Sequence, residues 1–365
     1  MALVSKFTKA GQAGKKIRVM VVDDSLLARK VIMEGLSQDP EIEIAGYAIN
    51  AIDAKNKVAR LNPDVMTLDV QMPGMTGMDF LKQLLPEHPL PVVLCSSLNL
   101  GVFDALHAGA VDFVRKPDTS QSNEAFIATL TQKVHIAARA RVQQQPRDPR
   151  YSERVAAATQ PTTVAPPPLG AAVPDRFIIG LGASTGGTEA TLEVLKRLPE
   201  DIPGMVITQH MPTGFTKMYA ERLDRLCKME VREAKDGDEI RRGLALVAPA
   251  DLQMRVMRSP MGGYRVSCQP GEKVSGHRPS VDALFFSMAQ NVQCKMVGII
   301  MTGMGADGAK GLLEMRQKGA YTIGQDKESC VVYGMPGVAN DIGAVMVQAS
   351  CQEVANVLLR HLKTK

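Results

Sequence analysis

Residues 176–198 read RFIIGLGASTGGTEATLEVLKRL, an apolar run followed by a glycine-rich turn and a second apolar pattern. The short first run is typical of a buried strand, and the spacing in the last part is typical of an amphipathic helix. A strand that turns tightly into a helix is the repeating unit of α/β proteins with parallel sheets. A single serine, Ser184, lies in this turn, where parallel sheets form their ligand sites.

The same alternation continues to the C-terminal end of the chain. Further strands are expected at residues 204–210, 295–303 and 320–326. A helix is expected after the first of these strands, and further helices at 279–292, 309–319 and 351–362. The stretch 244–270 is rich in β-forming residues and predicts a β-hairpin insertion. Residues 175–365 are therefore predicted to form a doubly wound α/β domain with a parallel sheet.

The first part of the chain repeats the strand–helix unit five times. Expected strands lie at residues 17–22, 42–48, 65–70, 91–97 and 112–116, and amphipathic segments follow each of them. This pattern predicts a flavodoxin-like (βα)5 domain over residues 16–137.

Two segments do not follow this alternation. Residues 138–174 are rich in Pro, Ala, Gln, Thr and Arg and lack a sustained apolar period. Such a segment buries too little surface to offset its ordering entropy, so it is expected to be a linker. Residues 1–15 are read as a basic tail, without the apolar region of a signal peptide.

Composition narrows the class of protein. The net charge of +5 in 365 residues is mild and spread along the chain, which does not favour binding to nucleic acid. No apolar stretch approaches the length of a membrane-spanning helix, so direct membrane insertion is not expected. The six cysteines are scattered without a C-x-x-C pair, which is typical of reduced thiols and predicts a cytoplasmic protein.

In the first domain, polar residues lie at the carboxyl ends of four expected strands. They are Asp23, Asp24, Asp69, Ser96 and Lys116. Three carboxylates at one edge of a sheet repel one another unless a cation is present, and Mg²⁺ prefers oxygen ligands. A hydroxyl and an ammonium group beside them could hold a phosphoryl group. Each aspartate could instead simply cap a helix, as single residues at such positions often do.

With this constellation, residues 16–137 resemble the response-regulator receiver family. The resemblance implies that Asp69 is the phospho-acceptor and that Asp23 and Asp24 help it to hold Mg²⁺. It also implies that Ser96 and Lys116 contact the phosphoryl group, and that the donor is a phosphohistidine of a sensor kinase.

Ser184 admits several interpretations. A dinucleotide-binding turn requires a third glycine where Thr185 stands, and an acidic residue after the next strand, where the sequence has Gln209 and His210. A Walker A motif is absent. Residues 182–186, GASTG, match the G-x-S-x-G pattern that exposes a serine nucleophile, although a serine before a helix is also a common N-cap.

A serine nucleophile requires a base and an acid that orients the base. Packing or surface roles suffice for four of the six histidines, namely His88, His107, His135 and His361. His210 ends the strand after Ser184, and adjacent parallel strands lie about 4.8 Å apart. Asp307 lies in a glycine-rich turn after another buried strand. Ser184, His210 and Asp307 are therefore the predicted triad, while His277 remains a second histidine to consider.

The motifs GASTGG, QHMP, GHRPSVD and TGMGADGAKG resemble the catalytic domain of the chemotaxis protein-glutamate methylesterases. The resemblance covers about residues 175–362. It implies a phosphorylation-activated esterase that hydrolyses glutamyl methyl esters on methyl-accepting chemotaxis receptors and, in some members, deamidates glutamines. It implies no cofactor for the ester chemistry.

Finer roles in this domain are less determined by the sequence. Backbone N–H groups near Thr185 and Met304 are predicted to bind the oxyanion. His277 and Arg278 could contact the substrate or, equally, support the following helix. A transcriptional regulator would require a DNA-binding helix-turn-helix, whereas strands follow the linker here. A regulatory protein with an inactive triad stays open as an alternative.

Overall fold

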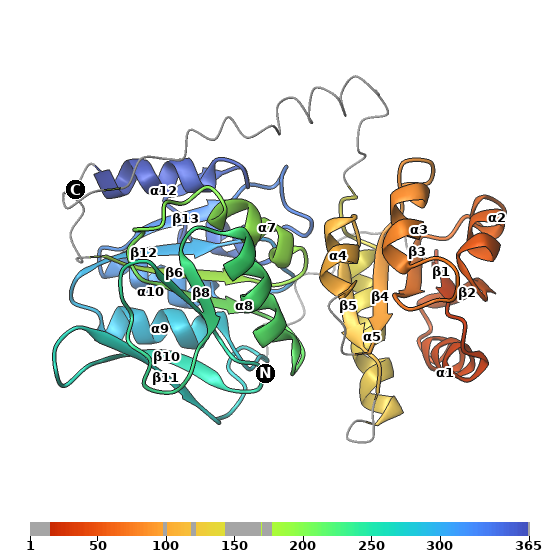
Figure 1. Ribbon diagram of the computed structural model, residues 1–365, viewed down its shortest axis with the longest axis horizontal. Helices are drawn as coiled ribbons and strands as arrows, with labels where there is room; N and C mark the ends of the chain where they lie inside the picture. The colour runs from red at the N-terminus through yellow and green to blue at the C-terminus, as the bar shows by residue number, and fades with distance from the viewer. Residues whose placement is uncertain (1–14, 98–100, 118–121, 143–168, 170–176, 364–365) are drawn as a thin grey trace. The chain divides into compact units, whose positions relative to one another are not determined.

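The computed structural model describes residues 15–97, 101–117, 122–142, 169 and 177–363. They form two compact units, each built around its own parallel sheet (Figure 1). The predicted linker and basic tail lie almost wholly outside the described residues.

The first domain alternates strands and helices five times, as predicted. Its elements are β1 (Ile17–Val22), α1 (Leu26–Leu36), β2 (Ile42–Ala48), α2 (Ala51–Leu61), β3 (Val65–Asp69), α3 (Gly77–Leu84), β4 (Val92–Ser96), α4 (Gly101–His107), β5 (Asp112–Arg115) and α5 (Asn123–Ala137). The strand order β2-β1-β3-β4-β5 is that of flavodoxin-like folds.

Burial explains why the strands of this domain read as continuous apolar runs. All residues of β3 and β4 are buried, because helices cover both faces of a parallel sheet. Helices α1 and α5 pack against each other, and α2 packs against α3.

The second domain contains a seven-stranded parallel sheet in the order β14-β13-β12-β6-β7-β9-β8. Its elements are β6 (Phe177–Ala183), α7 (Gly187–Leu195), β7 (Met205–Gln209), α8 (Phe215–Leu226), β8 (Glu230–Glu233), β9 (Leu244–Val247), β10 (Gln253–Arg258), β11 (Tyr264–Gln269), α9 (Val281–Asn291), β12 (Lys295–Ile300), α10 (Ala309–Gln317), β13 (Tyr321–Gln325), α11 (Met335–Asp341), β14 (Val347–Ala349) and α12 (Val354–Lys363).

Helices cover both faces of this sheet, as Figure 1 shows. Helices α9 and α10 pack on one face, and α7 and α12 pack on the other. The first strand, β6, lies between β7 and β12. The strands that come next in the chain are added on the β7 side, and the later strands, from β12 on, are added on the other side. Such a reversal of strand order opens a crevice at the carboxyl ends of the strands.

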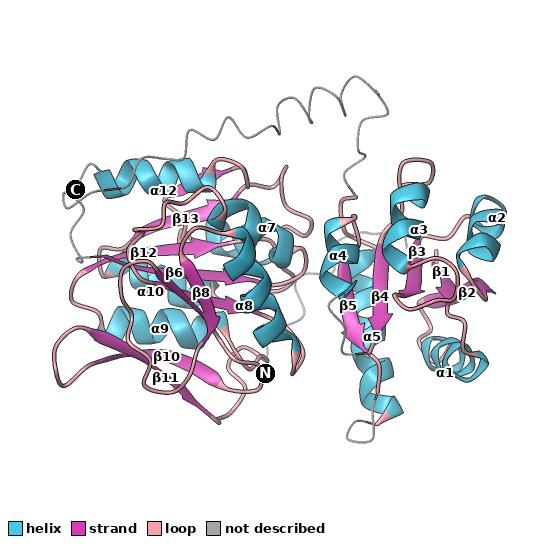
Figure 2. Ribbon diagram, viewed as in Figure 1, coloured by secondary structure: helices cyan, strands magenta, loops and turns pink. Residues whose placement is uncertain are grey.

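The predicted hairpin is present as the antiparallel pair β10–β11, separate from the main sheet (Figure 2). The start of the predicted stretch differs, because β9 pairs in parallel with β7 and β8 and belongs to the main sheet. Helix α9 packs against β10, which connects the hairpin to the helix that follows it in the chain. Among the described residues, no helix is both long and apolar enough to cross a membrane.

Candidate active site and phosphorylation site

The turn after β6 holds Ser184 at the carboxyl edge of the sheet. The residue that caps α7 is Gly186, with φ of 76°, so Ser184 is not the N-cap of this helix. A Cβ on Gly186 would stand 2.7 Å from the Val331 side chain, and positive φ also favours glycine there. The backbone N–H of Ser184 donates to the Thr302 carbonyl at 3.0 Å, which ties this turn to the loop after β12.

His210 follows β7 immediately beside Ser184. The parallel register pairs Ala183 with Gln209, and the N–H of His210 donates to the Ala183 carbonyl at 3.1 Å. The ring is almost buried, and its Nε2 lies 2.8 Å from Asp307 Oδ2. Its Nδ1 is buried and has no hydrogen-bond partner among the described residues. Among the described residues, the Ser184 hydroxyl therefore makes no hydrogen bond to the ring edge that Asp307 does not hold.

Asp307 receives four hydrogen-bond donors and is only 2% exposed. Besides His210, they are the hydroxyl of Ser280 and the backbone N–H groups of Val281 and Asp282, each at 2.8 Å. Burial alone would raise the pKa of Asp307, but the hydrogen bonds from His210 and the two N–H groups outweigh it and lower the pKa. The carboxylate therefore stays ionised at the N-terminus of α9, where the helix dipole favours negative charge.

Two glycines allow α9 to approach this edge. A Cβ on Gly182 would stand 2.1 Å from Val281 Cγ1, and one on Gly308 would stand 2.4 Å from the same atom. The first glycine of the GASTG motif thus makes room for the helix that holds Asp307. The sequence motif suggested that glycine at position 182 is needed for a tight turn, whereas the structure shows that it is needed for close packing.

Two residues that orient the site were not predicted from the sequence. Ser280 caps α9 and also donates to Asp307. The amide of Gln209 is buried, and its Nε2 donates to the carbonyls of Ser184 at 2.8 Å and His210 at 3.1 Å. Both lie inside quoted motifs, PSVD and QHMP, but their partners are distant in sequence.

The predicted oxyanion donors lie in two turns that are joined by Thr302. Its hydroxyl donates to the Thr185 carbonyl at 3.0 Å. A Cβ on Gly303, next to Met304, would stand 2.7 Å from the Ser184 Cβ. Among the described residues, the backbone N–H groups of Thr185 and Met304 have no acceptor.

His277 and Arg278 lie in the loop between β11 and α9. The His277 ring stacks on the His210 ring, with centroids 3.8 Å apart and planes inclined by 12°. Arg278 pairs with Asp251 at 2.5 Å and donates to the Gly271 carbonyl at 2.8 Å. Its guanidinium is therefore held within the loop.

In the first domain, the predicted acidic cluster converges at the edge of the sheet. Carboxylate oxygens of Asp23, Asp24 and Asp69 lie within 4.8 Å of one another. The Nζ of Lys116 lies 2.5 Å from Asp69 and 2.7 Å from Asp23. The adjacent helices are capped by Ser25 and Thr76, so capping does not explain the aspartates.

Charge and burial make this cluster receptive to a cation. Burial raises the pKa of Asp69 above its usual range, even though Lys116 opposes the shift. Hydrogen bonds with Asp23 and Asp69 outweigh burial and raise the pKa of Lys116. The hydroxyl of Ser96 is buried without a hydrogen-bond partner among the described residues. The donor set of three carboxylates fits a hard divalent ion such as Mg²⁺.

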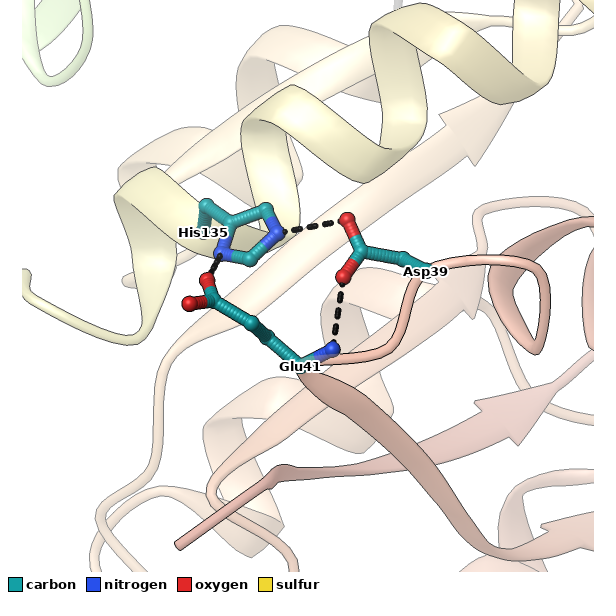
Figure 3. A group of neighbouring side chains, drawn as sticks. All are labelled: Asp39, Glu41 and His135. Atoms are coloured by element: carbon teal, nitrogen blue, oxygen red, sulfur yellow. Dashed lines mark hydrogen bonds and ion pairs between the residues drawn. The ribbon is translucent and has the colours of Figure 1, made fainter. Parts of the chain in front are cut away.

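A second group of acidic and histidine side chains connects α5 to the segment before β2 (Figure 3). His135 Nε2 lies 2.9 Å from Asp39, and its Nδ1 lies 3.7 Å from Glu41. Both imidazole nitrogens face carboxylates, so the contact joins α5 to the segment before β2. This agrees with the packing role expected for His135.

Comparison with known proteins assigns both domains. The family described as CheB methylesterase matches residues 179–358, and the response regulator receiver domain matches residues 19–126. Protein-glutamate methylesterase/protein-glutamine glutaminase 2 of Syntrophomonas wolfei is 47% identical over 349 residues, 95% of this chain and 98% of the relative. This chain belongs to the same family.

Another curated member of the methylesterase/glutaminase family aligns with nearly the whole chain. The enzyme named protein-glutamate methylesterase/protein-glutamine glutaminase 1 in Caulobacter vibrioides is 46% identical over 349 residues, 94% of this chain and 97% of the relative. The crystal structure of the CheB methylesterase catalytic domain of Thermotoga maritima is 32% identical, with a TM-score of 0.49, and covers 50% of this chain and 97% of that one.

Proposed function

We propose that the second domain is a serine esterase in which Ser184 is the nucleophile, His210 the general base and Asp307 the orienting acid. One observation carries the proposal: at the strand end beside Ser184, His210 is held at Nε2 by a buried carboxylate, while its buried Nδ1 has no partner in the part of the chain that the structure describes. The proposed substrate is the methyl ester of a glutamyl side chain, in agreement with the relatives' name protein-glutamate methylesterase. The protein that carries this side chain is proposed to be a methyl-accepting chemotaxis receptor.

In the first half of the reaction, the Ser184 oxygen attacks the ester carbonyl and His210 Nδ1 accepts the serine proton. The imidazolium that forms is stabilised by the ionised Asp307. When the tetrahedral intermediate collapses, the C–O bond to the methoxy group breaks, and His210 returns the proton to release methanol. Water then attacks the acyl-enzyme by the same route and frees the glutamate.

The oxyanion of the intermediate requires donors that are already in place. The N–H groups of Thr185 and Met304 are the proposed donors, because they border Ser184 and have no acceptor among the described residues. One such donor typically contributes about 3 kcal/mol to transition-state stabilisation. The same acyl transfer with an amide releases ammonia, so the site also suits deamidation of receptor glutamines.

The first domain supplies the regulation. Asp69 accepts a phosphoryl group from the phosphohistidine of a sensor kinase, and Asp23, Asp24 and Asp69 would hold Mg²⁺. The ion, when bound, neutralises charge on the carboxylates and on the transferring group. Ser96, with its unpartnered hydroxyl, and Lys116 would then contact the phosphoryl oxygens. Phosphorylation of Asp69 raises the esterase rate.

The proposal also gives the protein a cytoplasmic location, in keeping with the scattered, unpaired cysteines. From the sequence, His277 and Arg278 could contact the substrate or support the following helix. Arg278 is already engaged by Asp251 and Gly271, so the proposed triad assigns no substrate contact to it.

The test measures methanol released from methylated receptors by the full chain, with and without a small-molecule phosphodonor and Mg²⁺. Ser184→Ala should abolish release, and Asp69→Asn should remove only the increase caused by the phosphodonor. Labelling by a fluorophosphonate, followed by peptide mapping, should identify Ser184 as the modified residue. Full methanol release by Ser184→Ala would exclude the proposed nucleophile.

A further inference from the structure

His277 covers one face of the proposed catalytic base. The two imidazole rings are nearly parallel, with centroids 3.8 Å apart and an interplanar angle of 12°. His277 is half-buried and comes from a different loop, which ends where α9 begins. A histidine on a solvated loop does not need this arrangement, so the contact calls for an explanation in terms of His210.

The backbone of His277 is fixed on three sides. Its N–H donates to the Val274 carbonyl at 2.9 Å, and its carbonyl accepts from the Val274 N–H at 3.1 Å. The same carbonyl accepts from Gln253 Nε2 at 3.0 Å, at the first residue of β10. Arg278, the next residue, is tied to Asp251 and Gly271. The ring of His277 therefore projects from a rigid turn.

His210 has a corresponding need. Within the described part of the chain, its ring makes one hydrogen bond, at Nε2 with Asp307, and one bond at the ring edge does not fix the plane of the imidazole. The χ2 torsion of histidine is broad and adds little restraint. Rotation would change the position of Nδ1 relative to Ser184, and small misplacements of a catalytic group reduce rates severely. A flat ring stacked on the face of the imidazole prevents this rotation.

We propose that His277 is a positioning residue that holds the plane of the His210 ring, so that Nδ1 stays directed towards Ser184. The stacked π-face also lies against the ring that becomes an imidazolium during proton transfer, an arrangement that attracts a cation. The inference rests on the proposed triad, since it assigns His277 a role only if His210 is the base. Its chemistry requires a flat aromatic ring at position 277 rather than a second proton carrier.

The test compares His277→Ala, which removes the stacked ring, with His277→Phe, which keeps a flat ring and cannot carry a proton. Methanol release by the full chain, treated with phosphodonor, gives kcat and KM for each variant. We expect Ala to lower kcat by about 10- to 100-fold, the range for a misplaced catalytic group, with little change in KM. We expect Phe to restore kcat to within a few-fold of the wild type. Lys273→Ala, on the same loop and exposed, is the matched control.

Two results would overturn the inference: an unchanged kcat in His277→Ala, or a kcat in His277→Phe as low as in His277→Ala. The second would mean that the imidazole itself is needed. If the unchanged kcat in His277→Ala were accompanied by a higher KM, His277 would be a substrate contact instead of a positioning residue. Failure of the triad is recognised separately, because Ser184 would then not be labelled by fluorophosphonate in the wild-type protein. Melting temperatures of both variants equal to that of the wild type exclude a loss of fold as the cause of a lower kcat.

Discussion

Asp307→Asn is the substitution whose effect the structure determines most fully. Oδ1 of Asp307 accepts from the Ser280 hydroxyl and the Asp282 N–H, and Oδ2 accepts from His210 and the Val281 N–H. All four groups are donors to an ionised carboxylate. An asparagine keeps the shape but has only one acceptor oxygen, so its NH₂ group must face two of these donors.

Either orientation of the amide impairs the base. If the NH₂ faces His210, Nε2 must become the acceptor, and the imidazole proton moves to Nδ1. The nitrogen beside Ser184 is then a donor and cannot take the serine proton. If the NH₂ faces Ser280 and Asp282 instead, His210 keeps its bond but loses the negative charge that stabilises the imidazolium.

The magnitude follows from two independent estimates. Hydrogen bonds to charged groups contribute about 1.5–3 kcal/mol each, so the loss of two amounts to about 3–6 kcal/mol. Removing the charge of the acid in a Ser-His-Asp triad lowers kcat by about 10⁴-fold, which corresponds to about 5.4 kcal/mol. We expect kcat to fall by about 10³- to 10⁴-fold with KM nearly unchanged.

The assay is methanol release from methylated receptors, run beside thermal unfolding of each variant. Asp341→Asn, at an exposed aspartate that ends α11, is the matched control and should retain full activity. A folded Asp307→Asn protein with more than about a tenth of the wild-type kcat would refute the role given to Asp307.

Three further predictions follow from other contacts. Ser280→Ala removes both the cap of α9 and a bond to Asp307, so denaturant unfolding should show a loss of about 1–2 kcal/mol, together with a lower kcat; an unchanged unfolding midpoint would contradict it. Gln209→Leu removes the buried donor to the carbonyls of Ser184 and His210; because the Ser184 carbonyl still accepts from the Gly187 N–H, the loss should be about 1–3 kcal/mol, from the His210 carbonyl, in the same measurement. Because the pKa of Asp69 is raised on folding, the folded carboxyl binds its proton more tightly than the unfolded one, and stability falls as pH rises from the unfolded towards the folded pKa. Asp69→Asn should therefore raise the melting temperature of the first domain near neutral pH, with a gain that disappears below about pH 4 and shrinks when Mg²⁺ is added; a lower melting temperature would refute this.

The sequence predicted the sheet edge well because that information is local. The ends of β6 and β7 could be read from apolar runs, and parallel pairing then brings Ser184 and His210 together without further knowledge. Three short elements were missed: β8, α11 and β14. Helix α11, with the sequence MPGVAND, contains a proline and a glycine and has little helical period, so its structure depends on packing against α10 and β13.

The surroundings of Asp307 were also beyond the sequence, for a different reason. The segment PSVD predicts a helix start, and that prediction is correct. Nothing in the segment reveals that its N–H groups point at an aspartate 25 or more residues later. The contact depends on two glycines that admit Val281, one in β6 and one at the start of α10, which is a property of the packed fold. The stacking of His277 on His210 is non-local in the same way.

Two buried aspartates, each after a strand of a parallel sheet, show how surroundings divide similar groups between two functions. Asp307 meets four donors and its pKa falls, so it remains an anion that is fully satisfied by the protein. Asp69 meets one backbone N–H and Lys116, shares that lysine with Asp23, and its pKa rises. An anion that is already satisfied serves as a fixed acceptor for a base. An anion that the protein leaves under-compensated gains from any cation or covalent modification that relieves the repulsion. Burial acts on both, and the number and charge of the neighbouring donors suit one carboxylate to the proposed role of orienting a histidine and the other to the proposed role of accepting a metal ion and a phosphoryl group.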